Sequence, residues 1–145
     1  MRLVLQRVQR ARAVADGEVV ALIGAGLVLF VGFGRDDDDG LPERMARKVA
    51  NLRVFEEGES KFGRSILEEG GEVLTVSQMT LLADTGRGRR PNFSRAAGLE
   101  RSRQLYAAFG DGLELAGVPV VRAPFRSRLL VEAANWGPFT VVLDG

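Results

Sequence analysis

Alternating and continuous apolar positions along the chain predict a series of β-strands. A first strand is expected over residues 1–8, with Leu5 and Arg7 on one face. The apolar runs at 27–32 and 73–76 do not alternate, which predicts strands that are covered on both faces. Further short strands are expected at 53–55, 118–121, 129–133 and 139–143.

Turn-forming residues predict how these strands are connected. Asp16-Gly17 is the signature of a two-residue hairpin, because both central residues of that turn need positive φ. Pro119 confines its strand to a sheet edge or to a strand start. Residues 56–63 are rich in turn formers, and we expect Phe62 among them to belong to the core rather than to approach a ligand.

Apolar side chains at helical spacing predict two helices. Pro42 suits the first turn of one helix, and a second is expected over about 99–115. Strands joined by hairpins and crossovers, with helices between them, predict an α/β fold: a mixed, barrel-like β-sheet with packed helices. A length of 145 residues suits a single domain spanning 1–145. The expected inward positions are Met45, Val49 and Leu52 in the first helix and Leu105, Tyr106, Phe109 and Leu113 in the second.

Composition places the chain among globular proteins. Hydrophobic residues make up 46% and charged residues 27%, as in ordinary globular domains. The longest apolar run, 27–33, is far shorter than the roughly 18 residues that a membrane helix needs. The N-terminus lacks the apolar region of a signal peptide, so we expect a cytoplasmic protein.

The absence of two residue types narrows the possible chemistry. The chain contains no Cys and no His, which excludes thiol nucleophiles, Ser-His-Asp triads and thiolate metal sites. We expect neither a metal nor a cofactor. Catalysis would have to use carboxylates, hydroxyls, backbone groups or a group that the substrate supplies.

Charges are unevenly distributed although the net charge is only +1. Residues 36–39 are four aspartates; a metal site and a solvated loop before a helix N-terminus are the two interpretations, and ligand spacing favours the loop. Arg87, Arg89, Arg90 and Arg95 form a local basic segment that suits phosphate groups.

Two stretches are candidates for chemistry. Ser77-Gln78-Met79-Thr80 brings three neutral polar side chains to the end of a predicted buried strand, directly before the basic segment, which predicts a site for an anionic ligand. In 135–140, Gly137-Pro138 is either an ordinary turn or a cis peptide that presents two carbonyls to a ligand.

Together these stretches resemble motifs of the D-aminoacyl-tRNA deacylases. Ser77-Gln78-Met79-Thr80-Leu81 is similar to their Ser-Gln-Phe-Thr-Leu motif, and 135–140 to their Asn-x-Gly-Pro-Val/Phe-Thr motif. The resemblance extends over nearly the whole chain, including Gln6-Arg7-Val8 and 90–94. Three departures from the family motifs stand out. Met79 replaces Phe in the first motif. In the segment 125–129, which is usually Phe-Gly/Ala-Ala-Asp-Met in the family, Arg128 replaces an acid and Leu129 replaces Met.

The resemblance implies a hydrolase that cleaves the ester bond of D-aminoacyl-tRNA, and also of glycine mischarged on tRNA. It implies a homodimer in which Gly137-Pro138 of one subunit enters the other subunit's site and excludes L-amino acids. The 2′-hydroxyl of the terminal adenosine would drive the reaction. Thr80 as a covalent nucleophile is the rival assignment. The implied site residues are Ser77, Gln78, Met79 and Thr80 for catalysis, Gly137 and Pro138 for chiral selection, and Arg87, Arg89 and Arg90 for tRNA phosphates.

Two alternative functions remain open at this point. One is a related tRNA-editing deacylase that removes achiral or L-residues. The other is a non-catalytic tRNA-binding module, which would explain the arginines but not the polar strand end paired with Gly-Pro.

Overall fold

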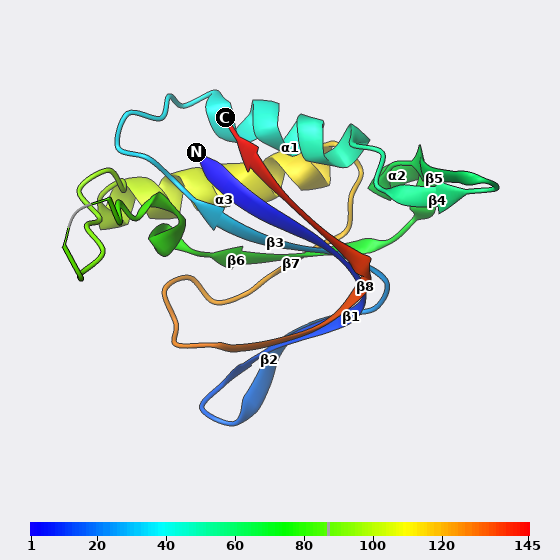
Figure 1. The fold of residues 1–145 in the computed structure, drawn as a ribbon, viewed down its shortest axis with the longest axis horizontal. Coiled ribbons are helices and arrows are strands. Elements are labelled where there is room, and N and C mark those ends of the chain that lie inside the picture. The colour runs from blue at the N-terminus through cyan, green and yellow to red at the C-terminus, as the bar shows by residue number, and fades with distance from the viewer. Residues whose placement is uncertain (87) are drawn as a thin grey trace.

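A mixed six-stranded β-sheet is the central element of the computed structural model, which describes residues 1–86 and 88–145 (Figure 1). The strand order is β2-β1-β3-β6-β7, and β8 pairs with β1. The elements are β1 (Arg2–Ala15), β2 (Glu18–Ile23), β3 (Gly26–Gly32), α1 (Leu41–Asn51), β4 (Phe55–Glu57), β5 (Ser60–Arg64), α2 (Ile66–Glu69), β6 (Glu72–Ser77), the 3-10 helix η1 (Met79–Leu82), α3 (Leu99–Leu115), β7 (Val120–Arg122) and β8 (Leu130–Asp144).

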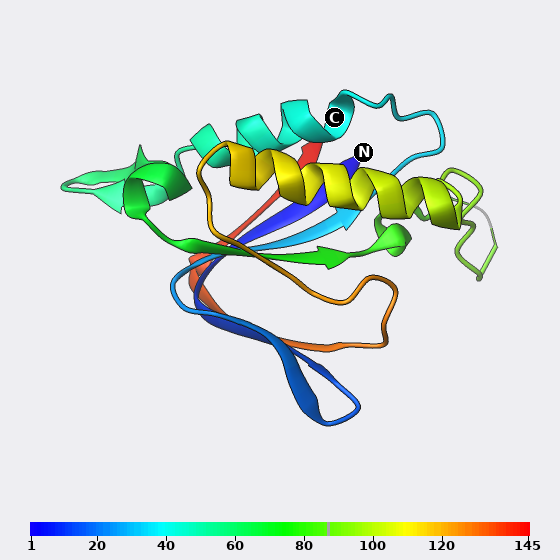
Figure 2. The ribbon, with the colours of Figure 1, turned by 180° about the vertical axis from the view of Figure 1, so that it is seen from behind.

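Strand β1 organises the sheet because it pairs antiparallel with β2, β3 and β8. Its first half pairs with β3, and its second half pairs with β2, while β8 follows it over both halves with two register shifts. The sheet therefore bends over itself and is nearly closed into a barrel, as the two opposite views show (Figures 1 and 2). The parallel pairs β3–β6 and β6–β7 complete it.

Two apolar cores stabilise this bent sheet. Helices α1 and α3 lie side by side over one face (Figure 2), and Phe109 and Leu113 of α3 are fully buried there with Leu3, Leu5 and Leu29 of the strands. The second core lies between the strands themselves. It contains Val8, Ala11, Ala13, Ala21, Ile23, Val28, Leu74, Val76 and Ala123.

Locally encoded elements agree with the expectations from sequence. The Asp16-Gly17 hairpin is confirmed, with φ of 49° and 85° at its two central residues. Helix α3 spans the expected Leu99–Leu115, and the strand with Pro119 beside it lies at an edge of the sheet.

Three expectations were wrong. The strands expected at 129–133 and 139–143 are one continuous strand, because β8 pairs with β1 along its length. The turn-rich segment after Val54 is a β4–β5 hairpin, and Phe62 at its tip is 54% exposed rather than in the core. The first strand continues to Ala15, well beyond residue 8.

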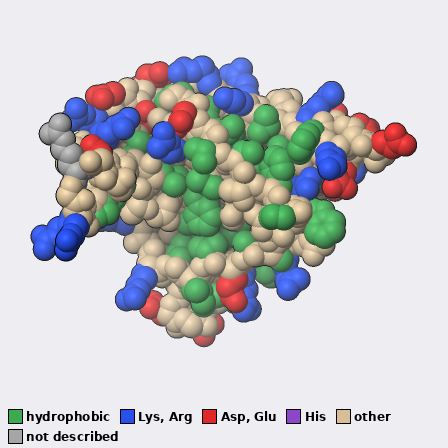
Figure 3. Space-filling model, viewed as in Figure 1, with side chains coloured by type: hydrophobic (Ala, Val, Ile, Leu, Met, Phe, Trp, Pro, Cys, Tyr) green, Lys and Arg blue, Asp and Glu red, His purple; other side chains and the backbone are tan. Residues whose placement is uncertain are grey.

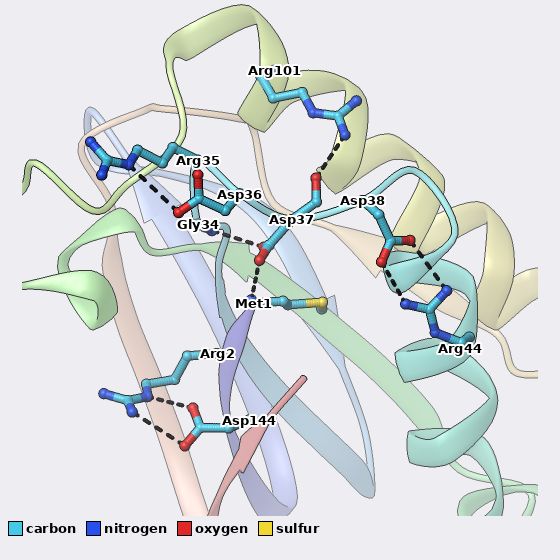
Figure 4. Close-up of polar contacts among 10 residues, drawn as sticks. All are labelled: Met1, Arg2, Gly34, Arg35, Asp36, Asp37, Asp38, Arg44, Arg101 and Asp144. Carbon is cyan, nitrogen blue, oxygen red and sulfur yellow. Dashed lines mark hydrogen bonds and ion pairs between the residues drawn. The ribbon is translucent and has the colours of Figure 1, made fainter.

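The four aspartates lie in the loop before α1, where each carboxylate has a cationic partner; Figure 4 shows the first three of them. Asp37 accepts hydrogen bonds from the Met1 amino group at 2.6 Å and from the Gly34 N–H at 2.8 Å. Asp38 pairs with Arg44 at 2.8 Å, and this hydrogen bond lowers the pKa of Asp38. Asp36 lies 3.6 Å from Arg35, and Asp39 pairs with Arg101. These four contacts therefore hold the loop against the neighbouring elements.

Among the helices of the described residues, none combines the length and the apolar character that a membrane span requires.

Candidate active site

The polar motif lies where β6 ends and the chain turns into η1. Ser77 is the last residue of β6 and pairs with Val31 of β3, and the Gln78 N–H donates to the Val31 carbonyl at 2.8 Å. Gly32 makes this turn possible, since a Cβ there would lie 2.7 Å from the Gln78 carbonyl oxygen and 2.5 Å from Leu82 Cδ2. The 3-10 helix therefore packs directly against the end of β3.

The side chains of this turn are accessible. Ser77 and Gln78 are half-buried, whereas Thr80 is exposed and Met79 is 46% exposed. The Gln78 side-chain amide donates to the Thr80 hydroxyl. The N–H groups at the start of η1 have no acceptor within the helix, because the first turn of any helix lacks one.

A cavity of about 260 Å³ opens beside Ser77 and Met79. This volume is slightly below the roughly 300–1,000 Å³ of sites that enclose a drug-sized ligand. It would therefore hold one base or one small side chain rather than a whole aminoacyl-nucleotide. The wall is formed by Val31, Gly32, Phe33, Ala97, Leu99, Ser102, Phe125 and Arg126.

A buried tyrosine supports this wall from behind. The Tyr106 hydroxyl lies 2.9 Å from Thr75 Oγ1 and 2.8 Å from the Thr75 carbonyl, and its burial raises the pKa of Tyr106. Its ring packs on Phe125 with centroids 5.6 Å apart, and Arg103 covers Phe125 from another side at 5.1 Å. Phe125 is thus held in place by α3.

The second motif lies in the middle of β8, where the Gly137-Pro138 peptide is cis and both residues are exposed. Asn135 holds the strand on either side: its Oδ1 accepts from the Phe139 N–H at 2.7 Å, and its Nδ2 donates to Thr140 Oγ1 at 3.0 Å. The exposed Phe62 ring packs on Phe139 at 5.7 Å. The motif is therefore presented on an ordered strand.

Arg7 supports the second motif from below. Its side chain is only 7% exposed, and its Nε donates to the Trp136 carbonyl at 3.0 Å while Nη1 donates to the Val54 carbonyl at 2.7 Å. Its guanidinium lies 5.2 Å from the centroid of the Phe139 ring. A Cβ at Gly137, whose φ is 133°, would lie 2.9 Å from Arg7 Nη2. Glycine is therefore required for this close approach.

The two motifs do not meet within one chain. The end of β6 and the middle of β8 lie at opposite ends of the sheet in both views (Figures 1 and 2). Over residues 1–86 and 88–145, no hydrogen bond joins the motifs, and the cavity beside Ser77 shares no lining residue with the one beside Trp136. Within one chain, the two motifs are therefore separate.

The basic segment forms the loop between η1 and α3. Arg87 lies outside the described residues, while Arg89 and Arg90 are exposed. Asp84 and Asn92 close the loop through two backbone hydrogen bonds of 2.7 and 2.9 Å. Figure 3 shows Lys and Arg side chains projecting at the end of the molecule where this loop lies.

Sequence reasoning missed several residues that surround the two motifs. Arg7 had a visible signal, because a charged residue on the apolar face of a predicted strand needs a buried partner. Phe125, Arg126, Ala97 and Ser102 had none, since only the folded chain brings these segments together beside Ser77.

A family profile described as "D-Tyr-tRNA(Tyr) deacylase" matches residues 4–144. The chain belongs to this family. Curated relatives named D-aminoacyl-tRNA deacylase include a protein of Symbiobacterium thermophilum, 48% identical over 99% of this chain and 95% of its own length. Another, from Deinococcus radiodurans, is 42% identical over 99% of both chains.

Solved structures show the same fold. One described as "c-Myc DNA Unwinding Element Binding Protein" is 32% identical, covers 100% of this chain and 99% of its own, and has a TM-score of 0.93. Another, described as a probable eukaryotic D-amino acid tRNA deacylase, has a TM-score of 0.85 at 19% identity, with 98% and 97% coverage. The family and the fold predicted from sequence are therefore confirmed.

Proposed function

We propose that this protein hydrolyses the ester bond of D-aminoacyl-tRNA and releases free tRNA and the D-amino acid. Family membership and the names of its relatives support this activity. The observation that carries the proposal is the accessible polar turn Ser77–Thr80 beside a small cavity at the end of β6. We treat residues 1–145 as one deacylase domain acting in the cytoplasm.

Catalysis would be assisted by the substrate, because the chain has no His or Cys to act as base or nucleophile. The 2′-hydroxyl of the terminal adenosine would supply the catalytic proton transfer. Ser77 and Gln78 would orient the adenosine, and the N–H groups of Met79 and Thr80 would stabilise the developing oxyanion. Replacing the terminal adenosine by 2′-deoxyadenosine should therefore slow deacylation by roughly 100-fold or more.

Positioning explains Thr80 better than nucleophilic attack does. The group bonded to its hydroxyl is the Gln78 amide, which donates a hydrogen bond there and has no capacity to remove a proton. Thr80 is also exposed, which leaves its hydroxyl hydrated rather than activated.

Stereochemical selection would come from Gly137 and Pro138 of a second copy. Both residues are exposed and rigidly supported by Asn135 and Arg7, yet they lie far from Ser77–Thr80 of their own chain. Backbone groups at this position would bind the substrate α-amino group and leave no space for an L side chain. Glycine has no side chain, so the same site would also release glycine mischarged on tRNA.

A homodimer would bring the two half-sites together. Strand β8 pairs only with β1 in the described residues, and it carries exposed Leu130, Trp136 and Val142. An edge strand presents unpaired backbone N–H and C=O groups, which another chain can pair with. Figure 3 shows hydrophobic side chains grouped near the centre of this view of the molecule.

The basic loop would bind tRNA phosphates through Arg89 and Arg90, together with Arg87. Arg89 and Arg90 are exposed and have no carboxylate within ion-pair distance in the described structure. Replacing both by Gln should weaken tRNA binding and reduce the slope of log affinity against log salt.

The test is deacylation of D-tyrosyl-, L-tyrosyl- and glycyl-tRNA by the same preparation. The proposal expects the D-substrate to be cleaved more than about 100-fold faster than the L-substrate. Equal rates on the D- and L-substrates would replace it by an editing deacylase for L or achiral residues. Tight tRNA binding without turnover on any charged tRNA would instead indicate a non-catalytic binding module.

A further inference from the structure

The turn before β8 holds an arginine in a conformation that favours glycine. The Ser127 N–H donates to the Pro124 carbonyl at 3.4 Å, which places Arg126 third in a four-residue turn with φ of 62°. Turns with positive φ at this position normally carry Gly or Asn, because a Cβ is disfavoured there. Residues held in disfavoured backbone conformations cluster at functional sites, which makes the Arg126 side chain a candidate for a role in binding.

Among the described residues, Arg126 is the one ionisable residue in the wall of the cavity beside Ser77. Two other arginines nearby are engaged: Arg103 pairs with Glu100 and covers Phe125, and Arg122 pairs with Asp111 and Glu114. Arg126 forms no ion pair with any carboxylate in the described part of the chain. Its guanidinium is therefore available to a ligand.

We infer that Arg126 binds a phosphate group of the 3′-terminal nucleotide of the substrate, while the apolar part of the cavity holds its uncharged portion. This inference rests on the proposed function. Guanidinium groups match phosphate oxygens with paired, charge-assisted hydrogen bonds, and an adjacent apolar wall suits a base. The aminoacyl end carries a cationic α-amino group, which Arg126 repels. Arg126 thus fixes the direction in which the substrate lies along the site.

The position of the turn fits this role. The loop between β7 and β8 and the basic loop between η1 and α3 lie at the same end of the molecule in both views (Figures 1 and 2). A phosphate bound at Arg126 would therefore be followed by phosphates near Arg89 and Arg90, as a continuous nucleic-acid strand requires.

The test compares binding of adenosine and adenosine 5′-monophosphate by calorimetry at low salt. Wild-type protein should bind the monophosphate roughly threefold to tenfold more tightly than adenosine. Arg126→Gly should abolish that preference, leave adenosine binding unchanged, and keep or raise Tm because glycine is favoured at this φ. Arg128→Gly is the matched control: it removes an exposed cation from the same loop, and Arg128 lines a different cavity, together with Asp16 and Gly17. It should retain the preference.

Two results would overturn the inference. One is a preference for adenosine 5′-monophosphate over adenosine that survives Arg126→Gly. The other is a wild-type protein that does not prefer the monophosphate, which includes the case in which neither compound binds saturably. Deacylation of D-tyrosyl-tRNA is measured on the same proteins. Deacylation without a monophosphate preference rejects the inference alone. A preference that Arg126→Gly removes, in a protein without deacylase activity, supports the phosphate site and rejects the proposed reaction.

Discussion

At the scale of single residues, a buried arginine holds the Gly-Pro motif in place. Arg7 donates to the carbonyls of Trp136 and Val54, which lie far apart in sequence, and so joins β8 to the segment after α1. Both carbonyls would lose their donor if the guanidinium were removed. Leaving a buried polar group without a hydrogen-bond partner lowers stability, so this one side chain affects both the stability of the fold and the position of the Gly-Pro motif.

Arg7→Met should lower the free energy of unfolding by roughly 2–4 kcal/mol, since two hydrogen bonds from a charged donor are lost. Urea denaturation measures this change. Arg10→Met is the control, because Arg10 is exposed on the same strand and its replacement should cost less than about 0.5 kcal/mol. Equal effects of the two variants would contradict the supporting role of Arg7.

Thr80→Ala should keep deacylation within about tenfold of wild type, because the hydroxyl only completes the turn with Gln78. Single-turnover rates on D-tyrosyl-tRNA measure this. Complete loss of activity in a variant with an unchanged unfolding curve would show instead that Thr80 is the nucleophile.

Elements with local signals were predictable from sequence, whereas those set by long-range pairing were not. Helix α3 was predicted because its apolar residues repeat within a few turns. The continuity of β8 was not, because it depends on pairing with β1, whose residues precede it by more than a hundred positions. The residues of the cavity wall could not be predicted for the same reason, because they come from segments that are distant in sequence. The polar turn itself was predicted, since Ser77–Thr80 is contiguous.

Gly32→Ala should displace η1 from β3, because the added Cβ would collide with the Gln78 carbonyl and Leu82. Activity should fall by about 100-fold or more, because misplacing catalytic groups by about 1 Å has effects of this size. The control is Gly24→Ala, where the nearest atom to the new Cβ is 3.6 Å away. Activity retained in Gly32→Ala would show that the position of η1 does not matter for catalysis.

The Arg2–Asp144 pair joins β1 to the end of β8 and should make stability depend on acid pH. The hydrogen bond from Arg2 lowers the pKa of Asp144, so the stabilisation is complete above the unfolded pKa of about 4 and disappears as pH falls through the lower folded pKa. Asp144→Asn should therefore destabilise the protein at pH 7 and not near pH 2. The effect is at most about 1 kcal/mol, because both groups are largely exposed.

An Arg2→Ala background provides the control for this pH dependence. Without the Arg2 guanidinium, Asp144→Asn should lose most of its destabilising effect at pH 7. The unfolding free energies of the two single variants and the double variant together give the coupling energy between Arg2 and Asp144. A destabilisation by Asp144→Asn that is the same at every pH would contradict the role of the ion pair.

The separation of the two motifs is the main result at the scale of the whole molecule. Ser77–Thr80 and Gly137-Pro138 lie at opposite ends of one sheet, and β8 presents an apolar edge beside the second motif. A two-fold symmetric dimer has identical contacts on both subunits, so one interface would complete two equal sites. The central claim is that each site combines the polar turn of one subunit with the Gly-Pro motif of its partner.

Complementation between two inactive variants tests this claim most directly. Ser77→Ala/Gln78→Ala and Gly137→Ala/Pro138→Ala are each shown to be folded and inactive, then unfolded together and refolded as a mixture. Half of the dimers will be mixed, each with one intact site, so D-tyrosyl-tRNA deacylation should return to about one quarter of the wild-type rate. Separately refolded variants that are mixed only afterwards are the control. No recovery in the co-refolded sample, with mixed dimers shown to be present, would contradict a site shared between subunits.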